Sequence, residues 1–317
     1  MANGFSPDPE APVLVIGAAG VDIVGRLRSE VRPGTSTPAQ IRFSFGGVAR
    51  NIAENLARLG LRVNLISAVG KDEYGERLLQ GLVSAGVNTQ AVLCTSQEPT
   101  SSYLAVINPP GDLQFALDDM RATNSLTPDY IRGYAELFKE ASLLFIDANL
   151  PKDTLRTVMS LARKARLPVC ADPTSVVLAP RLRPYLSRFF LMTPNTAEAT
   201  VLCDRTTPVV GLRLALDAAK CLVTNGVEIA IVTMAEQGLC YATSETYGHI
   251  PAIKTTIVDP TGAGDALSAA VIFALLNDIP LDDAVRLGVS AASLTLHSRG
   301  AVASDLSLEK LYDQLVI

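Results

Sequence analysis

The stretch from Asp259 to Asp265, which reads DPTGAGD, is the part of the chain whose residue types and spacing most clearly suit chemistry. Residues 266–276 after it are apolar and alanine-rich without Pro or Gly, so the glycines are expected at a helix N-terminus. Free backbone N–H groups and the positive end of the helix dipole meet there, which suits an anion such as a phosphoryl group. The alternative is a glycine-rich turn that only begins a helix.

Individual residues of this stretch add to the phosphate interpretation. Glycine at 262 and 264 lets the backbone approach phosphate oxygens without an intervening Cβ. Asp265 would then lie beside the transferred group as a candidate general base. The motif therefore predicts a site for phosphoryl transfer.

The elements that must position this motif follow a βαβ rhythm. Short, nearly all-apolar runs alternate with helical patterns such as residues 47–59, which predicts an α/β fold around a parallel sheet covered on both faces. The expected strands are residues 13–17, 63–69, 143–147, 169–172, 190–193 and 229–233.

Polar side chains stand at or just beyond the ends of these strands. Ligands of open parallel sheets bind at the carboxyl ends of the strands, so we expect these side chains to converge on one edge. They are Asp22, Asn149, Asp172, Asn195 and Thr233.

Two segments, residues 21–45 and 99–118, do not fit the βαβ rhythm. They contain short alternating runs separated by turn residues, for example the Pro109 to Asp112 turn, and predict a small antiparallel sheet. Its apolar face needs a partner, so the sheet could cover a cleft, form a dimer contact, or do both. An ordinary edge hairpin is the alternative.

Composition excludes several classes of protein. With 317 residues, 48% hydrophobic and 19% charged, the chain can bury a large core in one globular domain. The net charge of −5 and the absence of a Lys/Arg block argue against a nucleic-acid partner, and no apolar run is long enough to span a bilayer. Five cysteines without CxxC spacing and two histidines predict neither disulfides nor a structural zinc site, and we expect a cytoplasmic protein without a membrane partner.

The chain resembles the ribokinase or PfkB carbohydrate kinase family over nearly its whole length. The resemblance rests on GGVARN at 46–51, PNTAE at 194–198 and DPTGAGD at 259–265, in the family's order. It implies a single domain over residues 1–317, with a ribokinase-like three-layer α/β/α core and a mostly parallel central sheet. It also implies a small antiparallel lid formed by residues 21–45 and 99–118, through which the chain would dimerise.

Within the family, the pseudouridine kinases are the most similar branch. The features that carry this are VDI at 21–23, GGVARNIAENLARLG at 46–60, Asp119-Met120 and DANLP at 147–151. They imply an ATP-dependent kinase for the 5′-hydroxyl of pseudouridine. The alternatives are a family kinase for ribose or another nucleoside, and a non-catalytic sugar- or nucleotide-binding regulator.

The resemblance also implies roles at the reacting centre. Asp265 matches the catalytic base, while the N–H groups of Gly262, Ala263 and Gly264 would hold the developing negative charge.

The resemblance places the sugar hydroxyls between two further parts of the chain. Asp22, Asn51 and the backbone at Gly46 and Gly47 match positions that hold ribose-like hydroxyls. For Asp22 the alternative is a turn acid after the first strand.

Metal and nucleotide roles come from the same resemblance. Asn195 and Glu198 match an NxxE element that holds Mg²⁺ through water, although both could equally cap a helix. Residues 291–300 are expected to flank the adenine. The residues matched to ATP are Asn195, Thr233, Gly238, Gly262, Gly264, Ala292 and Ser298.

A monovalent cation site is implied as well, so K⁺ activation is expected. Asp259 could instead stabilise the turn before Gly262. The matching positions are Asp259, Thr261, Thr295, Ser298, Gly300 and Ser304.

Recognition of the base is the least defined part of the expected site. Arg50, Tyr103, Asp119 and Asn149 are candidates by their place near the cleft. Each has a structural alternative: a solvated helix residue, a lid aromatic, a turn residue and a strand-end cap, respectively.

Overall fold

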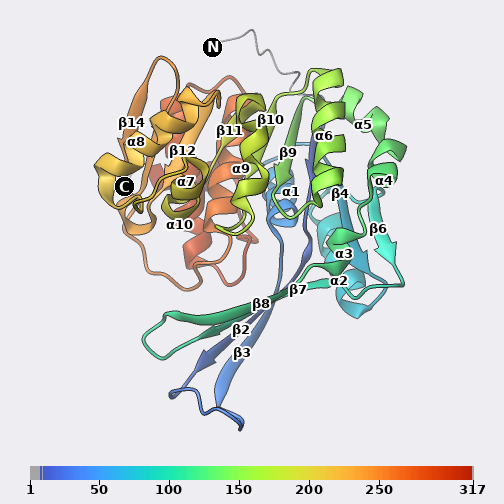
Figure 1. Cartoon of the computed structure of the whole chain (residues 1–317), viewed down its shortest axis with the longest axis vertical. Helices are drawn as coiled ribbons and strands as arrows, with labels where there is room; N and C mark the ends of the chain where they lie inside the picture. The colour runs from blue at the N-terminus through green and yellow to red at the C-terminus, as the bar shows by residue number, and fades with distance from the viewer. Residues whose placement is uncertain (1–7, 9, 316–317) are drawn as a thin grey trace.

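The chain folds as a three-layer α/β/α body with a small sheet projecting from one end (Figure 1). The computed structural model describes residue 8 and residues 10–315. The central sheet has the order β14-β13-β12-β11-β10-β9-β1-β4-β5, with β6 paired to β4, and its strands from β5 to β12 are parallel. These features confirm the predicted ribokinase-like α/β class.

The bounds of the elements are as follows. The strands of the central sheet are β1 (Val13–Ile16), β4 (Val63–Gly70), β5 (Val87–Asn88), β6 (Val92–Thr95), β9 (Leu143–Asp147), β10 (Val169–Asp172), β11 (Phe189–Met192), β12 (Ile229–Thr233), β13 (Leu239–Ala242) and β14 (Tyr247–Ile250). The helices are α1 (Val48–Arg58), α2 (Glu73–Ser84), α3 (Arg121–Asn124), α4 (Pro128–Gly133), α5 (Ala135–Glu140), α6 (Lys152–Ala165), α7 (Thr196–Leu202), α8 (Gly211–Thr224), α9 (Ala263–Leu276), α10 (Leu281–His297) and α11 (Leu308–Leu315). No helix in this described part is long and apolar enough to cross a membrane.

Side chains of the central strands alternate between two cores, one on each face of the sheet. On β1, Val13 and Val15 join the core formed with α1, α2, α9 and α10. Leu14 and Ile16 join the core formed with α4 to α8. Because both faces are buried, the parallel strands read as continuous apolar runs, which is the pattern that predicted them.

The structure also contains strands that the sequence analysis did not predict. β13 and β14 extend the sheet beyond β12 as an antiparallel hairpin. Tyr247 and His249 on β14 are exposed, so this edge strand lacks the apolar run that identified its neighbours.

A second sheet, which we call the lid sheet, comprises β2 (Gly20–Leu27), β3 (Ala39–Gly46), β7 (Ser101–Ile107) and β8 (Leu113–Asp119) in the order β3-β2-β7-β8. The predicted second sheet is confirmed, although one pair differs from the antiparallel prediction: β2 and β7 run parallel. These two strands are not joined by a hairpin. Each leaves the core at the same edge of the central sheet and therefore runs in the same direction (Figure 1).

The two faces of the lid sheet differ in chemistry. Asp22 lies opposite Ser44 on β3 and Tyr103 on β7, so these polar residues share one face. The other face carries Ile41, Phe43, Phe115 and Leu117, which are 47–62% exposed. The first face lines a cavity, while the second is an apolar surface open to solvent.

A change in the core provides a test of this packing. Phe145 on β9 is only 1% exposed between β1 and β10, so we expect Phe145→Ala to lower the free energy of unfolding by about 3–5 kcal/mol. Val177, 84% exposed, is the control, and Val177→Ala should change the same quantity by less than about 0.5 kcal/mol. Urea unfolding followed by circular dichroism measures both, and equal effects would contradict the described core.

Candidate active site

A hydrogen bond between α1 and α9 lies at the centre of the candidate site. Asp265 is on the first turn of α9, and its Oδ2 accepts a hydrogen bond from Asn51 Nδ2 at 2.7 Å. Asp22, on the lid strand β2, is close enough that its charge raises the pKa of Asp265. Three residues singled out in the sequence are thus brought together from distant parts of the chain.

The local electrostatics suit a proton acceptor near neutral pH. Burial raises the pKa of Asp265 to about 7; the charges of Asp22 and Asp147 act in the same direction, while the Asn51 hydrogen bond and Arg50 oppose it. Burial likewise raises the pKa of Asp22 to about 6. A carboxyl group with a pKa near the working pH is well matched to general base catalysis.

The N-terminus of α9 presents free backbone donors. Gly262 is the N-cap with φ of 79°, and no side chain of the described residues caps it by hydrogen bonding. A Cβ on Gly262 would lie 1.9 Å from the carbonyl oxygen of Ala301, whereas Gly264 has no other group within 4 Å of its Cβ position. The first N–H groups of α9, from Ala263 onward, are therefore available to an anion.

Glycines at 46 and 47 allow the lid strands to close against α1. A Cβ on Gly46 would lie 2.0 Å from Asp22 Oδ2, so the Asp22 carboxylate packs directly over this glycine. Gly47 has φ of 96° and begins α1, and a Cβ there would lie 2.5 Å from the Ala18 carbonyl oxygen. Tyr103 pairs with Asp22 in the sheet, and burial together with the Asp22 charge raises its pKa.

Asp147, at the end of β9, was not assigned a role from the sequence. Its side chain is fully buried: Oδ2 accepts hydrogen bonds from the N–H groups of Ala18 (2.8 Å) and Ala49 (3.1 Å), and Oδ1 accepts one from Asn149 (2.9 Å). A Cβ on Gly17 would lie 2.3 Å from Oδ2. One carboxylate therefore joins the turn after β1, the start of α1 and Asn149. The sequence signal that could have identified Asp147 is its position as the only acid of the apolar strand LLFID, at the end of that strand.

The four base-recognition candidates have different surroundings. Arg50 is buried and donates hydrogen bonds to Asn51 and Glu54, so it is not a solvated helix residue. Asp119 accepts from Arg121 with both carboxylate oxygens, which is the turn role considered as its alternative. Tyr103 lines the cavity under the lid sheet, and Asn149 is buried beside Asp147.

Asn195 and Glu198 form a capping box at the start of α7. Asn195 Oδ1 accepts from the Glu198 N–H and Glu198 Oε2 accepts from the Asn195 N–H, both at 2.9 Å. The charge of Glu198 raises the pKa of the buried neighbour Asp172. A cation beside these adjacent carboxyl groups would favour their ionised forms, which fits a hydrated Mg²⁺ held through waters. They do not form a direct cage, since no group of three or more His, Cys, Asp or Glu in the described chain is arranged to ligate a metal.

Of the residues matched to nucleotide, Asn195 and Thr233 lie at the carboxyl ends of β11 and β12, and the others belong to the following loop, α9 and α10. Thr233 forms an isolated parallel bridge with Asn195. Gly238 has φ of 86°, and a Cβ would lie 2.1 Å from the Ile250 carbonyl oxygen, so the approach of β14 already requires this glycine. Ala292 packs on the core from α10, and Ser298 ends that helix.

The residues matched to a monovalent cation lie around the loops that flank α9 and α10. Asp259 Oδ1 accepts from the Thr261 N–H at 3.0 Å, which is the turn role considered for this acid. The Thr295 carbonyl accepts from the Ser298 N–H at 2.9 Å. The Ser304 carbonyl accepts from Arg58 Nη1 at 2.6 Å. Gly300 lines the same cavity as Asp259 and Thr261.

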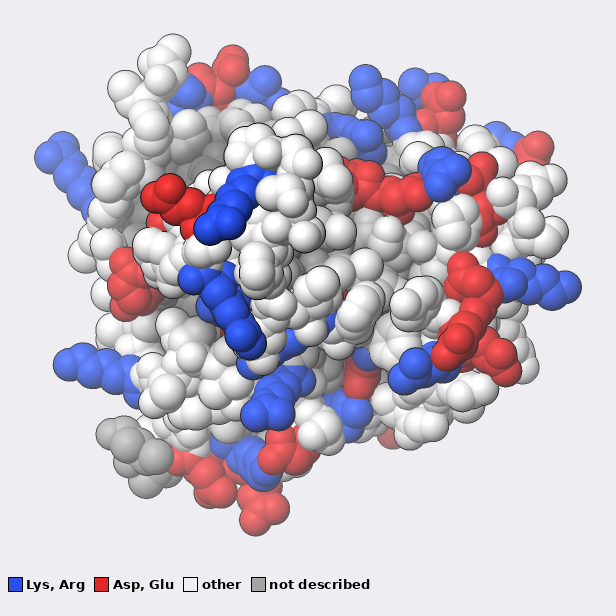
Figure 2. Space-filling view, turned by 90° about the horizontal axis from the view of Figure 1, so that it is seen from below, with Lys and Arg blue, Asp and Glu red and all other residues white. Residues whose placement is uncertain are grey.

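A cavity of about 580 Å³ separates the lid sheet from the loops at Asp259–Thr261 and Arg299–Gly300. Asp22 and Tyr103 line it, together with Arg26 and Arg42. Figure 2 views the molecule from the side of the lid sheet and shows positive side chains across the middle of this face with acidic ones beside them, so the face is not uniformly basic.

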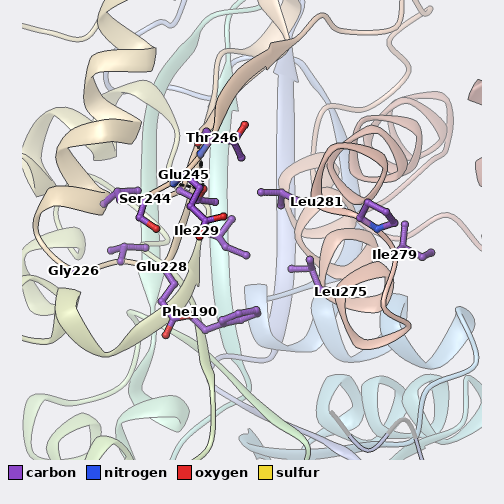
Figure 3. A pocket seen from close by; sticks show the side chains of 14 residues that line it. Phe190, Gly226, Glu228, Ile229, Ser244, Glu245, Thr246, Leu275, Ile279 and Leu281 are labelled. Carbon is purple, nitrogen blue, oxygen red and sulfur yellow. Dashed lines mark hydrogen bonds between the residues drawn. The ribbon is translucent and has the colours of Figure 1, made fainter. Parts of the chain in front are cut away.

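A second cavity, of about 400 Å³, lies elsewhere in the molecule (Figure 3). Phe190 and Ile229 line it at the amino ends of β11 and β12, together with Leu275 on α9 and Leu281 on α10. Asp265 is at the carboxyl ends of the strands, so this largely apolar cavity is remote from the candidate site.

Comparison with known proteins agrees with this geometry. The family described as pfkB family carbohydrate kinase matches residues 11–307. The chain belongs to this family. It is therefore a phosphotransferase with an alcohol group as acceptor, an ATP-dependent kinase of the sugar and nucleoside class.

Individual relatives span almost the whole chain. Pseudouridine kinase of Escherichia coli (strain K12) is 32% identical over 300 residues, covering 93% of this chain and 94% of the relative. Guanosine-inosine kinase of Exiguobacterium acetylicum is 31% identical, covering 90% and 94%. The structure of Arabidopsis thaliana ribokinase complexed with ribose and ATP has a TM-score of 0.84 at 21% identity, covering 97% and 99%, and supports the fold.

Two glycine substitutions separate stability from anion binding at α9. We expect Gly262→Ala to destabilise the fold by more than about 1–2 kcal/mol, because a left-handed backbone alone costs that much and Ala301 leaves no room for a Cβ. Gly264→Ala should fold at least as stably, since alanine favours helix, but its methyl group would crowd the bound anion and lower kcat. Thermal unfolding and a coupled ADP assay distinguish them; a stable, fully active Gly262→Ala variant would contradict this geometry.

Proposed function

We propose that this kinase phosphorylates the 5′-hydroxyl of pseudouridine with ATP. The observation that carries the mechanism is the pairing of Asp265 with Asn51 beside the uncapped N-terminus of α9. The similarity to a relative named pseudouridine kinase supports the substrate. A non-catalytic regulator is disfavoured, because binding alone does not require a buried carboxyl with a pKa near 7.

The proposed reaction is an in-line displacement. Asp265 takes the proton of the 5′-hydroxyl while the hydroxyl oxygen forms a bond to the γ-phosphorus of ATP. The bond from the γ-phosphorus to the β,γ-bridging oxygen breaks, and ADP leaves. The free N–H groups at Ala263 and Gly264 hold the negative charge that develops.

Other residues would hold the groups that accompany ATP. Mg²⁺ supplies neutralisation of phosphate charge when bound, and Asn195, Glu198 and Asp172 would hold it through waters. The loops at Asp259–Thr261 and Thr295–Ser304 are the proposed K⁺ site.

The cavity under the lid sheet favours a nucleoside over a free pentose. Beyond Asp22, the next position on the same face is Val24, which lies between Arg42 on β3 and Ala105 on β7. This apolar floor with a guanidinium at its edge would accommodate a flat ring that carries carbonyl acceptors. A bare ribose would leave that part of the 580 Å³ cavity unfilled. The second candidate, another nucleoside, is favoured by the similarity to guanosine-inosine kinase.

A substrate panel tests this assignment. ATP consumption with pseudouridine, uridine, guanosine and ribose should be highest for pseudouridine, and mass spectrometry should identify pseudouridine 5′-phosphate. Adding K⁺ at constant Mg²⁺ should increase the rate. Preference for another acceptor would overturn the substrate while retaining the kinase mechanism.

Asp265→Asn is expected to reduce kcat by about 100- to 10,000-fold, because the amide cannot accept the proton. In the wild type, kcat/KM should fall as pH drops below about 7, where Asp265 becomes protonated. Initial rates across pH measure this dependence, and calorimetry should show that the variant still binds nucleoside. Unchanged turnover by Asp265→Asn would exclude Asp265 as the base.

The same substitution should increase stability at high pH. The pKa of Asp265 is higher in the folded chain, at about 7, than its ordinary value of 3.8, so the folded state binds the extra proton and loses stability as pH rises between these values. Asn carries no charge at any pH. The stability advantage of Asp265→Asn should therefore grow from about pH 4 to about pH 7 and then level off.

We also propose a homodimer formed through the exposed apolar face of the lid sheet. Phe43 is 59% exposed on the edge strand β3 of this face, two residues along the strand from Ile41 and in the same cross-strand row as Leu117 on the opposite edge strand β8. Phe43→Lys should shift the protein toward monomer in light scattering, while Val177→Lys, at an exposed position outside the lid sheet, should not. A wild-type monomer at micromolar concentration would contradict the dimer.

A cytoplasmic location and the absence of a nucleic-acid partner remain predictions.

A further inference from the structure

Arg50 makes an extensive set of hydrogen bonds although it is only 7% exposed. Its Nη1 donates to Asn51 Oδ1 at 3.0 Å and to the Phe45 carbonyl at 3.2 Å, and its Nη2 pairs with Glu54 Oε2. Phe45 is the penultimate residue of the lid strand β3 and directly precedes Gly46 and Gly47. The guanidinium thus joins the end of the lid sheet, the first turn of α1 and the side chain of Asn51.

The contact to Asn51 matters because an amide has two chemically different ends of nearly equal size. A guanidinium only donates hydrogen bonds, so Arg50 requires the Oδ1 end of Asn51 to face it. The Nδ2 end then points to Asp265 Oδ2, 2.7 Å away. In the flipped orientation, Oδ1 would face the Asp265 carboxylate and the NH₂ group would face Arg50, which are both repulsive contacts.

We propose that Arg50 is a positioning residue of the phosphotransfer site, which fixes the orientation of the Asn51 amide and through it the Asp265 carboxylate. Asn51 then engages Oδ2 of Asp265, and no other described residue donates a hydrogen bond to Oδ1, which is left for the substrate hydroxyl. This inference rests on the proposed role of Asp265 as the base.

The charge of Arg50 supports the same role. Arg50 lowers the pKa of Asp265 and of Asp22, against the raising effect of burial on both. The other charged groups around Asp265 are acids from different elements: Asp22 on β2, Asp147 at the end of β9 and Asp172 at the end of β10. Arg50 therefore offsets part of an otherwise acidic surrounding.

Removing Arg50 leaves no unpaired ion on α1. Glu54 Oε1 also accepts from Arg58 Nε at 3.0 Å and Nη2 at 2.7 Å, so the Glu54 carboxylate keeps a partner. Arg50→Met retains the apolar stem, and Arg50→Lys retains the charge but not the two-pronged geometry. The matched control is Arg77→Met, because Arg77 and Glu73 form an exposed i,i+4 pair on α2 away from the site.

The first test compares kinetics of these variants on the full chain with ATP and nucleoside. Arg50→Met should lower kcat by up to about 100-fold, as expected when a reacting group is misplaced, and should move the acid limb of kcat/KM to higher pH. Arg50→Lys should keep the acid limb near its wild-type position. Its kcat should still be lowered by most of the factor expected for Arg50→Met. Arg77→Met should match the wild type in both, and all variants should be checked by thermal unfolding.

A double-mutant cycle separates positioning from a general structural effect. On the high-pH plateau of each variant's own pH profile, where Asp265 is ionised, adding Arg50→Met to Asn51→Ala should lower kcat by no more than about threefold. A loss as large as in the wild-type background would show that Arg50 does not act through Asn51 and would overturn the proposal.

The remaining outcomes distinguish this inference from the proposed function. If Arg50→Met keeps the wild-type kcat and pH profile while Asp265→Asn is inactive, the positioning role is wrong and the base assignment stands. If Asp265→Asn retains full turnover, the assignment of the base fails, and this inference fails with it. If Arg50→Met does not fold, the positioning role is tested with Arg50→Lys and with a double-mutant cycle built on it. A wild-type kcat in Arg50→Lys would refute the need for the guanidinium.

Discussion

The hydrogen bond between Asn51 and Asp265 joins two helices whose residues are 214 positions apart in the chain. Both helices start at a glycine with positive φ, Gly47 for α1 and Gly262 for α9. Asp147 accepts a hydrogen bond from the Ala49 N–H at the start of α1, whereas no described side chain caps the start of α9. The helices pack against each other on one face of the central sheet. The positive dipole ends of both helices, and the free N–H donors of α9, therefore meet where the substrate and the transferred phosphoryl group are expected.

This meeting of helix N-termini makes a cluster of buried acids tolerable. Asp22, Asp147, Asp172 and Asp265 all have a raised pKa, with burial as the largest cause. Backbone N–H groups offset part of this effect at Asp147, and Arg50 does so at Asp22 and Asp265. An arrangement that keeps carboxyl groups out of water costs stability, and such costs are typical of functional sites.

The lid sheet completes the arrangement by placing one wall of the site on strands that leave the core. Its polar face carries Asp22 and Tyr103. The pairing of β2 with β3 places the Asp22 carboxylate over Gly46. The opposite face is apolar and exposed. The same strands therefore serve two surfaces, because alternate side chains of a strand point to opposite faces.

Much of the architecture could be predicted from local patterns. The continuous apolar runs of β1, β4, β9, β10, β11 and β12 follow from burial on both faces, and the small-residue helix after DPTGAGD follows from its composition. The exposed strand β14 lacks such a run, and the parallel pairing of β2 with β7 depends on where the core directs two segments far apart in sequence. Neither could be read from local periodicity.

For the site, the sequence by itself determined which residue types were available: Asp22, Asn51 and Asp265, each next to glycines or a strand end that restrict the backbone. Only the tertiary structure decided their contacts. Arg50 was a candidate for base recognition, with a solvated helix residue as the alternative. Folding buries it against Asn51, which contradicts the solvated alternative. Asp147 had no assigned role, and folding makes it the acceptor for three separate segments. Propensity and motif spacing are local properties, whereas the orientation of an amide or the partners of a buried carboxylate depend on which distant donors the fold brings within hydrogen-bond distance.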